Sequence, residues 1–251
     1  MAKQKKVTIK HYLNKQLKPK EANGLLYYAP YTRVTYDRKN NKFPMDWDRE
    51  FSGPVVVFYN RFTEDQFTKF LQDTSSYVRE IDRMIEQSIR YEHHFFGDDF
   101  ELKGFGERFE LYRTSLYELF YSKVREDIVN GLEKHLSSVD LMKVRRALND
   151  PVFTGDSLQV GDEDLKKYHA ILPEDLFDDI NLCFLLSIYS VDGENRKYSR
   201  SITVFDWVVN GIRPDFEHFI HVVESKKGFK YSPKALDKLD LFVNQALSEV
   251  Y

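Results

Sequence analysis

Residues 27–43 read Tyr27-Tyr28-Ala29-Pro30-Tyr31-Thr32-Arg33-Val34-Thr35-Tyr36-Asp37-Arg38-Lys39-Asn40-Asn41-Lys42-Phe43. Aromatic and β-branched residues dominate positions 27–36 and predict a strand. Pro30 must lie near the start of this strand or on a sheet edge, because proline has no amide hydrogen for a ladder. Residues 37–41 are typical of a turn, and Lys42-Phe43 predicts the beginning of a short return strand.

A further strand is predicted upstream at residues 7–13, where strand-type residues alternate with polar ones. Residues 14–26, which include Pro19 and Gly24, are predicted to form a connection. The N-terminal part is therefore expected to be a small antiparallel sheet of two or three strands. Such a sheet is marginal alone, so a helix or a neighbouring domain must cover its apolar face.

From Thr63 onward the pattern becomes helical. Thr63-Glu64-Asp65-Gln66 fits a capping box, and apolar residues then recur at spacings of three and four through Ile89. A second long amphipathic helix is predicted over residues 109–132. Further helices are predicted at about 138–149, 162–170, 174–190 and 201–210, and near Pro214 and Pro233, which suit a first helical turn.

These patterns predict the α+β class: a small N-terminal antiparallel sheet of two to three strands followed by a predominantly α-helical domain. We assign residues 1–45 to the sheet domain and 63–251 to an acidic, mostly helical domain, with a subdivision near 150–160 left open. Residues 46–62 form a connecting segment that the pattern places neither in the sheet nor in the helical body.

Charge is divided unevenly along the chain. The first 42 residues carry eleven Lys or Arg and two acids, a local charge of about +9, whereas the whole chain has a net charge of -3. A division this sharp predicts a basic arm for a polyanion, joined to an acidic body with a different role.

The cysteine content and the apolar runs indicate the compartment. Cys183 is the single cysteine and cannot form an internal disulfide, which favours a reducing cytoplasm. No signal peptide is visible, and apolar runs such as Cys183-Phe184-Leu185-Leu186 are far too short to span a bilayer. We therefore expect a cytoplasmic protein with no membrane partner.

The segment Lys6-Val7-Thr8-Ile9-Lys10-His11-Tyr12-Leu13-Asn14, followed by residues 31–43, resembles the arm-type DNA-binding domain at the start of tyrosine recombinases. The likeness is greatest to the integrases of conjugative transposons and related phages, and it covers about 40 residues. The resemblance implies a three-stranded sheet that lies on double-stranded DNA at arm sites distant from strand exchange.

Known modes of DNA recognition are compatible with such a sheet. A sheet or β-ribbon can enter the major groove while Lys and Arg at the strand ends bind phosphates. Arg33 and Tyr36 are candidates for groove or sugar contacts. The candidates for phosphate contacts are Lys10, Lys15, Lys18, Lys20, Arg38, Lys39 and Lys42. The alternative is that these lysines only solubilise a small sheet and guard its edge.

The chain departs from the recombinases in its catalytic elements. Those enzymes need a His-x-x-Arg element, a second arginine and a late nucleophilic tyrosine, and here no histidine is followed by arginine three residues later. Tyr251 is C-terminal, but the arginines that would activate it are missing. We therefore expect a protein that is not a recombinase and, since no other catalytic motif is present, not an enzyme.

Two histidine clusters contain residue types that can bind metal ions. His93-His94 precedes Asp98-Asp99, but adjacent histidines at a helix end point about 100° apart, which strains joint ligation. His218 and His221 share a helix face but lack the glutamate of the His-Glu-x-x-His motif. Cys183 is flanked by leucines and phenylalanine and is expected to be a buried apolar side chain. We predict no metal and no cofactor.

The favoured interpretation is a non-catalytic DNA-binding accessory protein of a mobile genetic element. Its arm-like sheet would contact DNA, and its helical body would bind a protein partner or dimerise. The alternative is a protein–protein adaptor, such as a regulatory or anti-defence factor of a phage or transposon, that reuses the sheet as an interaction surface. An enzyme whose site is assembled from distant residues is a third interpretation.

Overall fold

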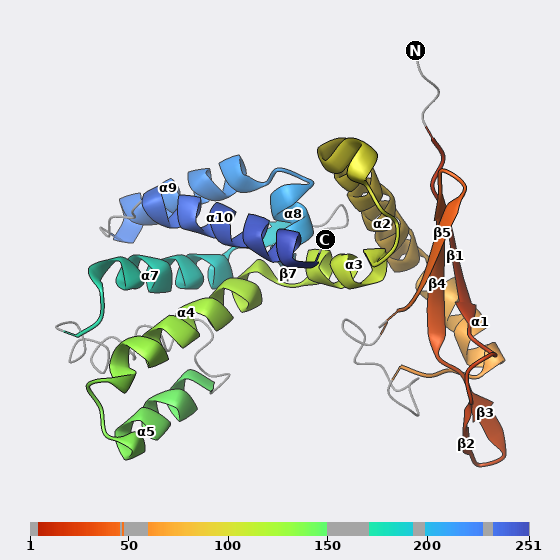
Figure 1. Cartoon of the computed structure of the whole chain (residues 1–251), viewed down its shortest axis with the longest axis horizontal. Coiled ribbons are helices and arrows are strands. Elements are labelled where there is room, and N and C mark those ends of the chain that lie inside the picture. Colours follow the sequence, from red (N-terminus) through yellow and green to blue (C-terminus); the bar gives the residue numbers. More distant parts are fainter. Residues whose placement is uncertain are drawn as a thin grey trace. The chain divides into compact units, whose positions relative to one another are not determined.

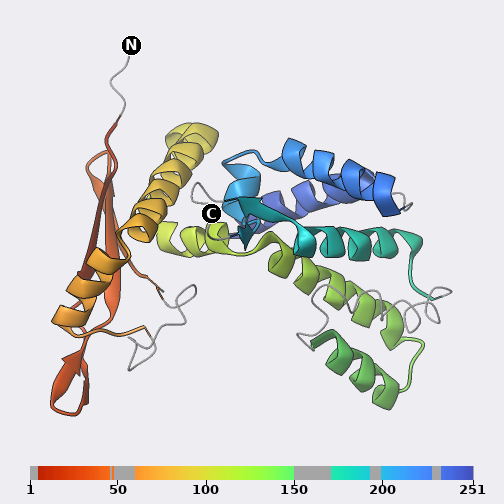
Figure 2. The same ribbon diagram turned by 180° about the vertical axis from the view of Figure 1, so that it is seen from behind.

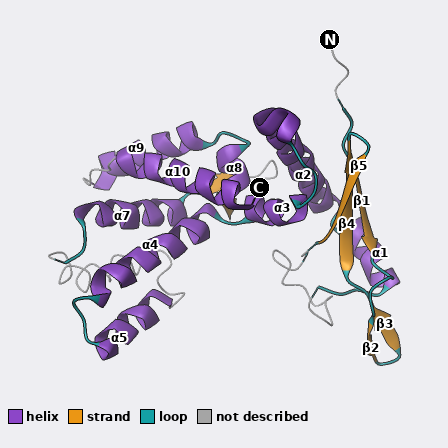
Figure 3. Ribbon diagram, viewed as in Figure 1, coloured by secondary structure: helices purple, strands orange, loops and turns teal. Residues whose placement is uncertain are grey.

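The computed structural model describes residues 5–45, 47, 60–149, 171–192, 199–227 and 233–250. The chain forms two compact units, residues 1–110 with 250–251 and residues 111–249. The predicted α+β class is confirmed, because an N-terminal antiparallel sheet precedes a mostly helical body (Figure 1, Figure 3). The first unit contains β1 (Thr8–Leu13), β2 (Lys20–Ala22), β3 (Leu25–Tyr27), β4 (Pro30–Tyr36), β5 (Lys39–Pro44), α1 (Glu64–Asp73), α2 (Ser75–Phe96), the 3₁₀ turn η1 (Gly97–Asp99) and most of α3 (Phe105–Arg113).

The main sheet has the order β1-β4-β5, with both neighbouring pairs antiparallel. The three predicted strands are thus confirmed, with ends shifted by a few residues. The predicted connection over residues 14–26 is wrong in part, because β2 and β3 form a separate two-stranded hairpin there. Asn23 and Gly24 have φ values of 52° and 73°, the left-handed conformation that a type I′ hairpin turn requires.

Helices of the first unit cover one face of the main sheet. Figure 2 shows α1 in front of the strands, and contacts from α2 and α3 complete the cover. Tyr36 of β4 packs against His93 of α2, and Phe43 of β5 packs against Phe105 and Phe109 of α3. The helices therefore bury the apolar side of a sheet that would be marginal by itself.

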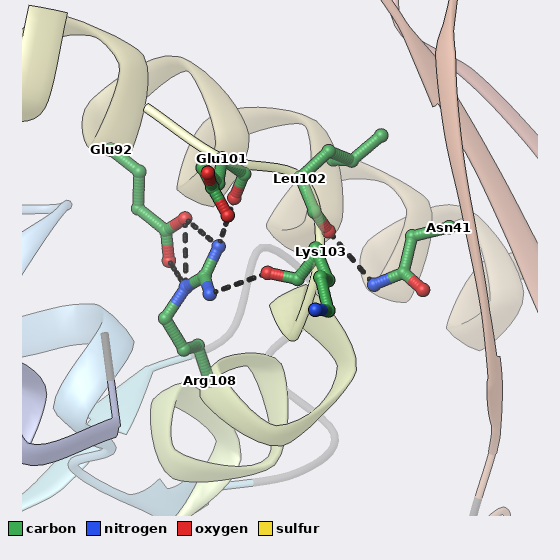
Figure 4. Close-up of polar contacts among 6 residues, drawn as sticks. All are labelled: Asn41, Glu92, Glu101, Leu102, Lys103 and Arg108. Atoms are coloured by element: carbon green, nitrogen blue, oxygen red, sulfur yellow. Dashed lines mark hydrogen bonds and ion pairs between the residues drawn. The ribbon is translucent and has the colours of Figure 1, made fainter. Parts of the chain in front are cut away.

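Glycine at position 106 allows this close packing. A Cβ at Gly106 would overlap the Cβ and Cγ of Phe43, so α3 approaches β5 more closely than an alanine at this position would permit. The Asn41 side chain of β5 also donates a hydrogen bond of 2.8 Å to the Leu102 carbonyl just before α3 (Figure 4).

A buried ion pair holds α2 against α3. The Arg108 guanidinium donates through Nε and Nη2 to the Glu92 carboxylate at 3.0–3.1 Å, and both side chains are almost completely buried (Figure 4). Its remaining donors reach the carbonyls of Lys103 at 3.0 Å and Glu101 at 2.6 Å. The guanidinium thus receives the acceptors that a buried charge requires.

The second unit is a helical body. Its α4 (Leu116–Glu133) buries Leu116, Phe120, Val124, Ile128 and Leu132 at a spacing of four, which confirms that part of the predicted amphipathic stripe. The single helix predicted over residues 109–132 is wrong in part, because α3 ends at Arg113 and Ser115 is the N-cap of a new helix, α4. Lys238 of α10 (Pro233–Val250) donates to Asp175 and Asp179 of α7 (Glu174–Ile188) at 2.8 and 3.0 Å. The elements are α4 (Leu116–Glu133), α5 (Ser138–Asn149), α7 (Glu174–Ile188), β6 (Ser190–Asp192), β7 (Ser199–Ser201), α8 (Val204–Val208), α9 (Arg213–Lys227) and α10 (Pro233–Val250).

Several boundaries differ from the sequence prediction. The β6–β7 hairpin was not predicted, and the predicted helix at 162–170 lies outside the described residues. The units divide at Glu110 and not near residue 62, because α1 and α2 belong with the sheet that they cover. Of the connecting segment 46–62, the structure describes residue 47 and residues 60–62, and Trp47 is buried against Phe70 of α1. No helix in the described ranges is long and apolar enough to cross a membrane.

Candidate nucleic-acid interface

The strand β4 divides its residues between two faces of the sheet. Thr32, Val34 and Tyr36 are buried, whereas Arg33 between them is exposed. Successive side chains of a strand point to opposite faces, so the register of the flanking strands assigns every residue to one face or the other. We call the face opposite the helices the open face; it consists of Thr8, Lys10, Tyr12, Tyr31, Arg33, Thr35, Asn40, Lys42 and Pro44.

A row of three cations crosses the open face. Lys10 lies opposite Arg33 on one side, and Lys42 lies opposite Arg33 on the other. All three side chains are exposed, and among the described residues no acid forms an ion pair with any of them. Neighbouring strands are about 4.8 Å apart, so the backbones of these three cationic residues lie within about 10 Å of one another. Like charges directly opposite each other destabilise a sheet.

The cationic row is flanked by two rows of different chemistry. On one side Thr8, Thr35 and Asn40 offer hydroxyl and amide groups, which can donate and accept hydrogen bonds. On the other side Tyr12 lies opposite Tyr31, with ring centroids 6.3 Å apart and planes tilted by 46°. We call Tyr12 and Tyr31 the tyrosine row. None of the nine open-face residues is acidic.

Two further predicted cations lie at the turn between β4 and β5. Asp37 and Arg38 have φ values of 48° and 64°, which identifies a two-residue turn of type I′. Arg38 and Lys39 are exposed there. Lys5 bonds Asp37 at 2.8 Å, and this hydrogen bond is the main reason that the pKa of Asp37 is lowered and that of Lys5 is raised. The single acid of the turn is thus already paired with a cation.

The other predicted lysines lie away from the open face. Lys15 follows β1 and forms an ion pair of 2.6 Å with Glu64 of α1, whose hydrogen bond raises the pKa of Lys15. Lys18 is exposed in the loop before β2, and Lys20 is exposed on β2 itself. The structure therefore brings Lys10, Arg33 and Lys42 together, and leaves Lys15, Lys18 and Lys20 outside the row.

Tyr36 is removed from the candidate interface. Its side chain is 5% exposed and packs edge-on against His93 and Phe100, at centroid distances of 5.4 and 5.8 Å. Tyr36 is three residues from Arg33, and residues an odd number apart in a strand point to opposite faces. The predicted groove or sugar contact by Tyr36 is therefore wrong, because its ring belongs to the core.

The covered face contains a hydrogen-bonded chain that sequence reasoning missed. His11 bonds Thr32 through Nδ1 at 2.8 Å and Asp82 through Nε2 at 2.9 Å. The residue types are those of a nucleophile–histidine–carboxylate triad. Thr32, however, is 0% exposed, so its hydroxyl cannot reach a substrate. These two hydrogen bonds instead link β1 and β4 to α2.

The cysteine and the histidine clusters considered in the sequence lie outside the sheet. Cys183 is buried on α7, as predicted, and burial raises the pKa of its thiol, which suppresses reactivity. His93 and His94 lie in the last turn of α2, and His221 bonds Glu224 at 3.1 Å. Within the described part of the chain, no three His, Cys, Asp or Glu side chains gather as metal ligands.

Six open-face residues were not among the predicted site residues: Thr8, Tyr12, Tyr31, Thr35, Asn40 and Pro44. The sequence contained a signal for four of them, because residues an even number apart in a strand point to the same face. Thr8 and Tyr12 are each two residues from Lys10, and Tyr31 and Thr35 are each two residues from Arg33. The positions of Asn40 and Pro44 depend on the turn length, which sets the β5 register.

Comparison with known proteins adds no relative. No family model matches the chain, and no match was found among curated proteins or among solved structures.

Proposed function

We propose that this protein is a non-catalytic DNA-binding accessory factor of a mobile genetic element, and that its open face contacts double-stranded DNA. The observation that carries the proposal is the cationic row Lys10–Arg33–Lys42, which is exposed and unopposed by acids on its own face. A row of like charges lowers the stability of the sheet, and a polyanion would relieve that repulsion.

The shape of the site supports a nucleic acid as the polyanion. A β-sheet face or ribbon can enter the major groove, and Arg38 and Lys39 at the β4–β5 turn extend the positive charge beyond the row. The hydroxyl and amide groups beside the row are suited to base edges or sugars. The resemblance of residues 6–14 and 31–43 to the arm-type domains of integrases supports the same assignment. The helical body would then bind a protein partner or dimerise, in the cytoplasm.

The test is a fluorescence-anisotropy titration of the full chain with a short labelled duplex at two salt concentrations. Each phosphate contact contributes about -0.9 to the slope of log affinity against log salt, so three contacts predict a slope of about -3. Charge reversal of Lys10, Arg33 and Lys42 to Glu should abolish binding while far-ultraviolet circular dichroism stays native.

A matched control changes the net charge by the same amount, at three positions elsewhere in the first unit. Lys69 of α1, Arg79 of α2 and Lys103 before α3 are exposed and lie outside the open face. Reversal of these three to Glu should leave most of the affinity intact. Retained binding in the row variant, or equal losses in both triple variants, would overturn the assignment of the interface.

One observation favours the adaptor alternative. The β2–β3 hairpin carries Leu25 and Leu26, which are 51% and 44% exposed, and Leu17 just before it is 43% exposed. Exposed apolar side chains of this kind occur in protein interfaces. The salt dependence of affinity discriminates between the two functions. Affinity for DNA falls steeply as the salt concentration rises, whereas the affinity of an interface anchored by apolar side chains would change little.

A further inference from the structure

The tyrosine row adds a chemistry that phosphate binding does not use. Tyr12 and Tyr31 lie on the open face, and each lies two residues from a member of the cationic row, Lys10 and Arg33 respectively. Same-face residues of a strand are about 6.8 Å apart, so the rings are adjacent to the row. Burial raises the pKa of the Tyr12 phenol, and the nearby charge of Arg33 acts in the opposite direction. The influence of Arg33 on the pKa of Tyr12 is consistent with the two side chains being neighbours on the open face.

Aromatic rings beside a cationic groove are the features that hold single-stranded nucleic acids. The cations follow the backbone and the rings stack on bases, which every unpaired base allows because each has a flat face. Paired bases in a duplex are stacked on one another and do not present that face. Phosphates are common to both forms of DNA, so the cationic row alone cannot distinguish them, whereas the tyrosine row can.

We propose that Tyr12 and Tyr31 stack on unpaired bases while Lys10, Arg33 and Lys42 hold the adjoining phosphates, so that the protein prefers DNA with a single-stranded segment to a fully paired duplex. This inference rests on the proposed DNA-binding function and specifies its ligand. The order of the rows places the rings at one border of the face, beside Leu13 and Pro30 at the end of the sheet. Duplex phosphates can thus meet the row while unpaired bases extend over the rings.

The experiment compares three labelled DNAs with the full chain: a blunt duplex, the same duplex with a single-stranded extension, and the same duplex with an abasic extension of equal length. The abasic extension adds the same phosphates without bases, so it corrects for charge. Base stacking on an aromatic side chain is worth about 1–3 kcal/mol per base, or roughly fivefold to 150-fold in affinity. We expect the extension with bases to bind at least about fivefold more tightly than the abasic one.

Paired variants isolate the rings. Tyr12→Leu with Tyr31→Leu should reduce the ratio of these two affinities to about one, because leucine has no flat face to stack. Tyr12→Phe with Tyr31→Phe should preserve the ratio, since stacking uses the ring and not the hydroxyl. As a readout that needs no variant, 2-aminopurine in the extension should lose fluorescence when the wild-type chain binds.

The outcomes separate the two proposals. Equal affinity of the wild type for the two extensions, or 2-aminopurine fluorescence that does not change on binding, overturns the stacking inference while duplex binding still stands. No binding to any of the three DNAs at low salt overturns the proposed function itself, and the stacking inference with it.

Discussion

Arg33 of β4 lies directly opposite Lys10 of β1, so two cations share one cross-strand position on the open face of the sheet. Their Cβ atoms are held about 4.5–5.5 Å apart by the ladder itself. The hydrogen-bonded backbone fixes this separation, and the two side chains can diverge only by extending into solvent. A feature of the proposed binding surface therefore also affects the stability of the sheet.

Arg33→Gln is expected to stabilise the fold while it weakens DNA binding. Removal of one of three neighbouring like charges should raise the free energy of unfolding by up to about 1 kcal/mol. Urea denaturation at low and high salt measures the effect, which should shrink at high salt because screening already reduces the repulsion. Lys103→Gln, which removes an exposed charge outside the row, should change stability little. A lower stability of Arg33→Gln at low salt would show that the row is not repulsive.

Glu92→Ala is expected to destabilise the first unit severely. Breaking a buried ion pair leaves one charge uncompensated, which costs about 3–5 kcal/mol. Glu86→Ala on the same helix is the control, because its partner Arg90 lies at 2.6 Å but both side chains are partly exposed. Exposed pairs contribute about 1 kcal/mol or less. Chemical denaturation of both variants should show a large difference, and similar losses would contradict a special role for the buried pair.

Gly106→Ala is expected to loosen the packing of α3 on β5. The added Cβ overlaps the Phe43 side chain at its root, where the chain cannot move aside, and overpacking of this kind costs about 1–3 kcal/mol. Hydrogen exchange of the β5 amides should accelerate. Gly131→Ala in α4 provides the comparison, since its Cβ meets only the end of the flexible Leu172 side chain and alanine favours a helix. Equal protection of β5 in Gly106→Ala and the wild type would refute the tight contact.

The helical body should lose stability at alkaline pH. Burial, helped by the neighbouring Tyr121, raises the pKa of Tyr117 to about 12 from an ordinary value of 10.0. The folded state therefore holds the phenolic proton more tightly than the unfolded state. The resulting stabilisation is complete below pH 10 and is lost as the pH rises from about 10 to 12.

Denaturation midpoints of the wild type and Tyr117→Phe across this pH range measure the contribution. The phenylalanine variant lacks the titrating group and should show a shallower alkaline decline. Tyr121, whose ring stacks on Tyr117 at 5.4 Å, also has a raised pKa and should preserve part of the slope. Parallel declines in the two proteins would show that Tyr117 does not contribute.

The sheet and the helical character of the two long amphipathic patterns were predictable because they depend on local periodicity. The breaks that divide these patterns, at Thr74 and at residues 114–115, were not predicted. The same reasoning missed the β2–β3 hairpin, although Asn23-Gly24 is a strong signal for a type I′ turn. It also grouped Arg33 with Tyr36, which strand alternation already separates. The alignment of Lys10 and Lys42 with Arg33 could not be predicted, because it depends on the registers of two strand pairs. The pair Glu92–Arg108 likewise depends on how α2 and α3 meet.

The alternation along β4 gives one strand two independent sets of residues. Positions 31, 33 and 35 face the surface, and positions 32, 34 and 36 face the core. Replacements in the first set change the chemistry of the surface without disturbing the interior, so this face of the sheet tolerates substitution. Insertion or deletion of a single residue would exchange the two sets and bury Arg33. The length of β4 is thus constrained more tightly than the identity of any residue on its outer side.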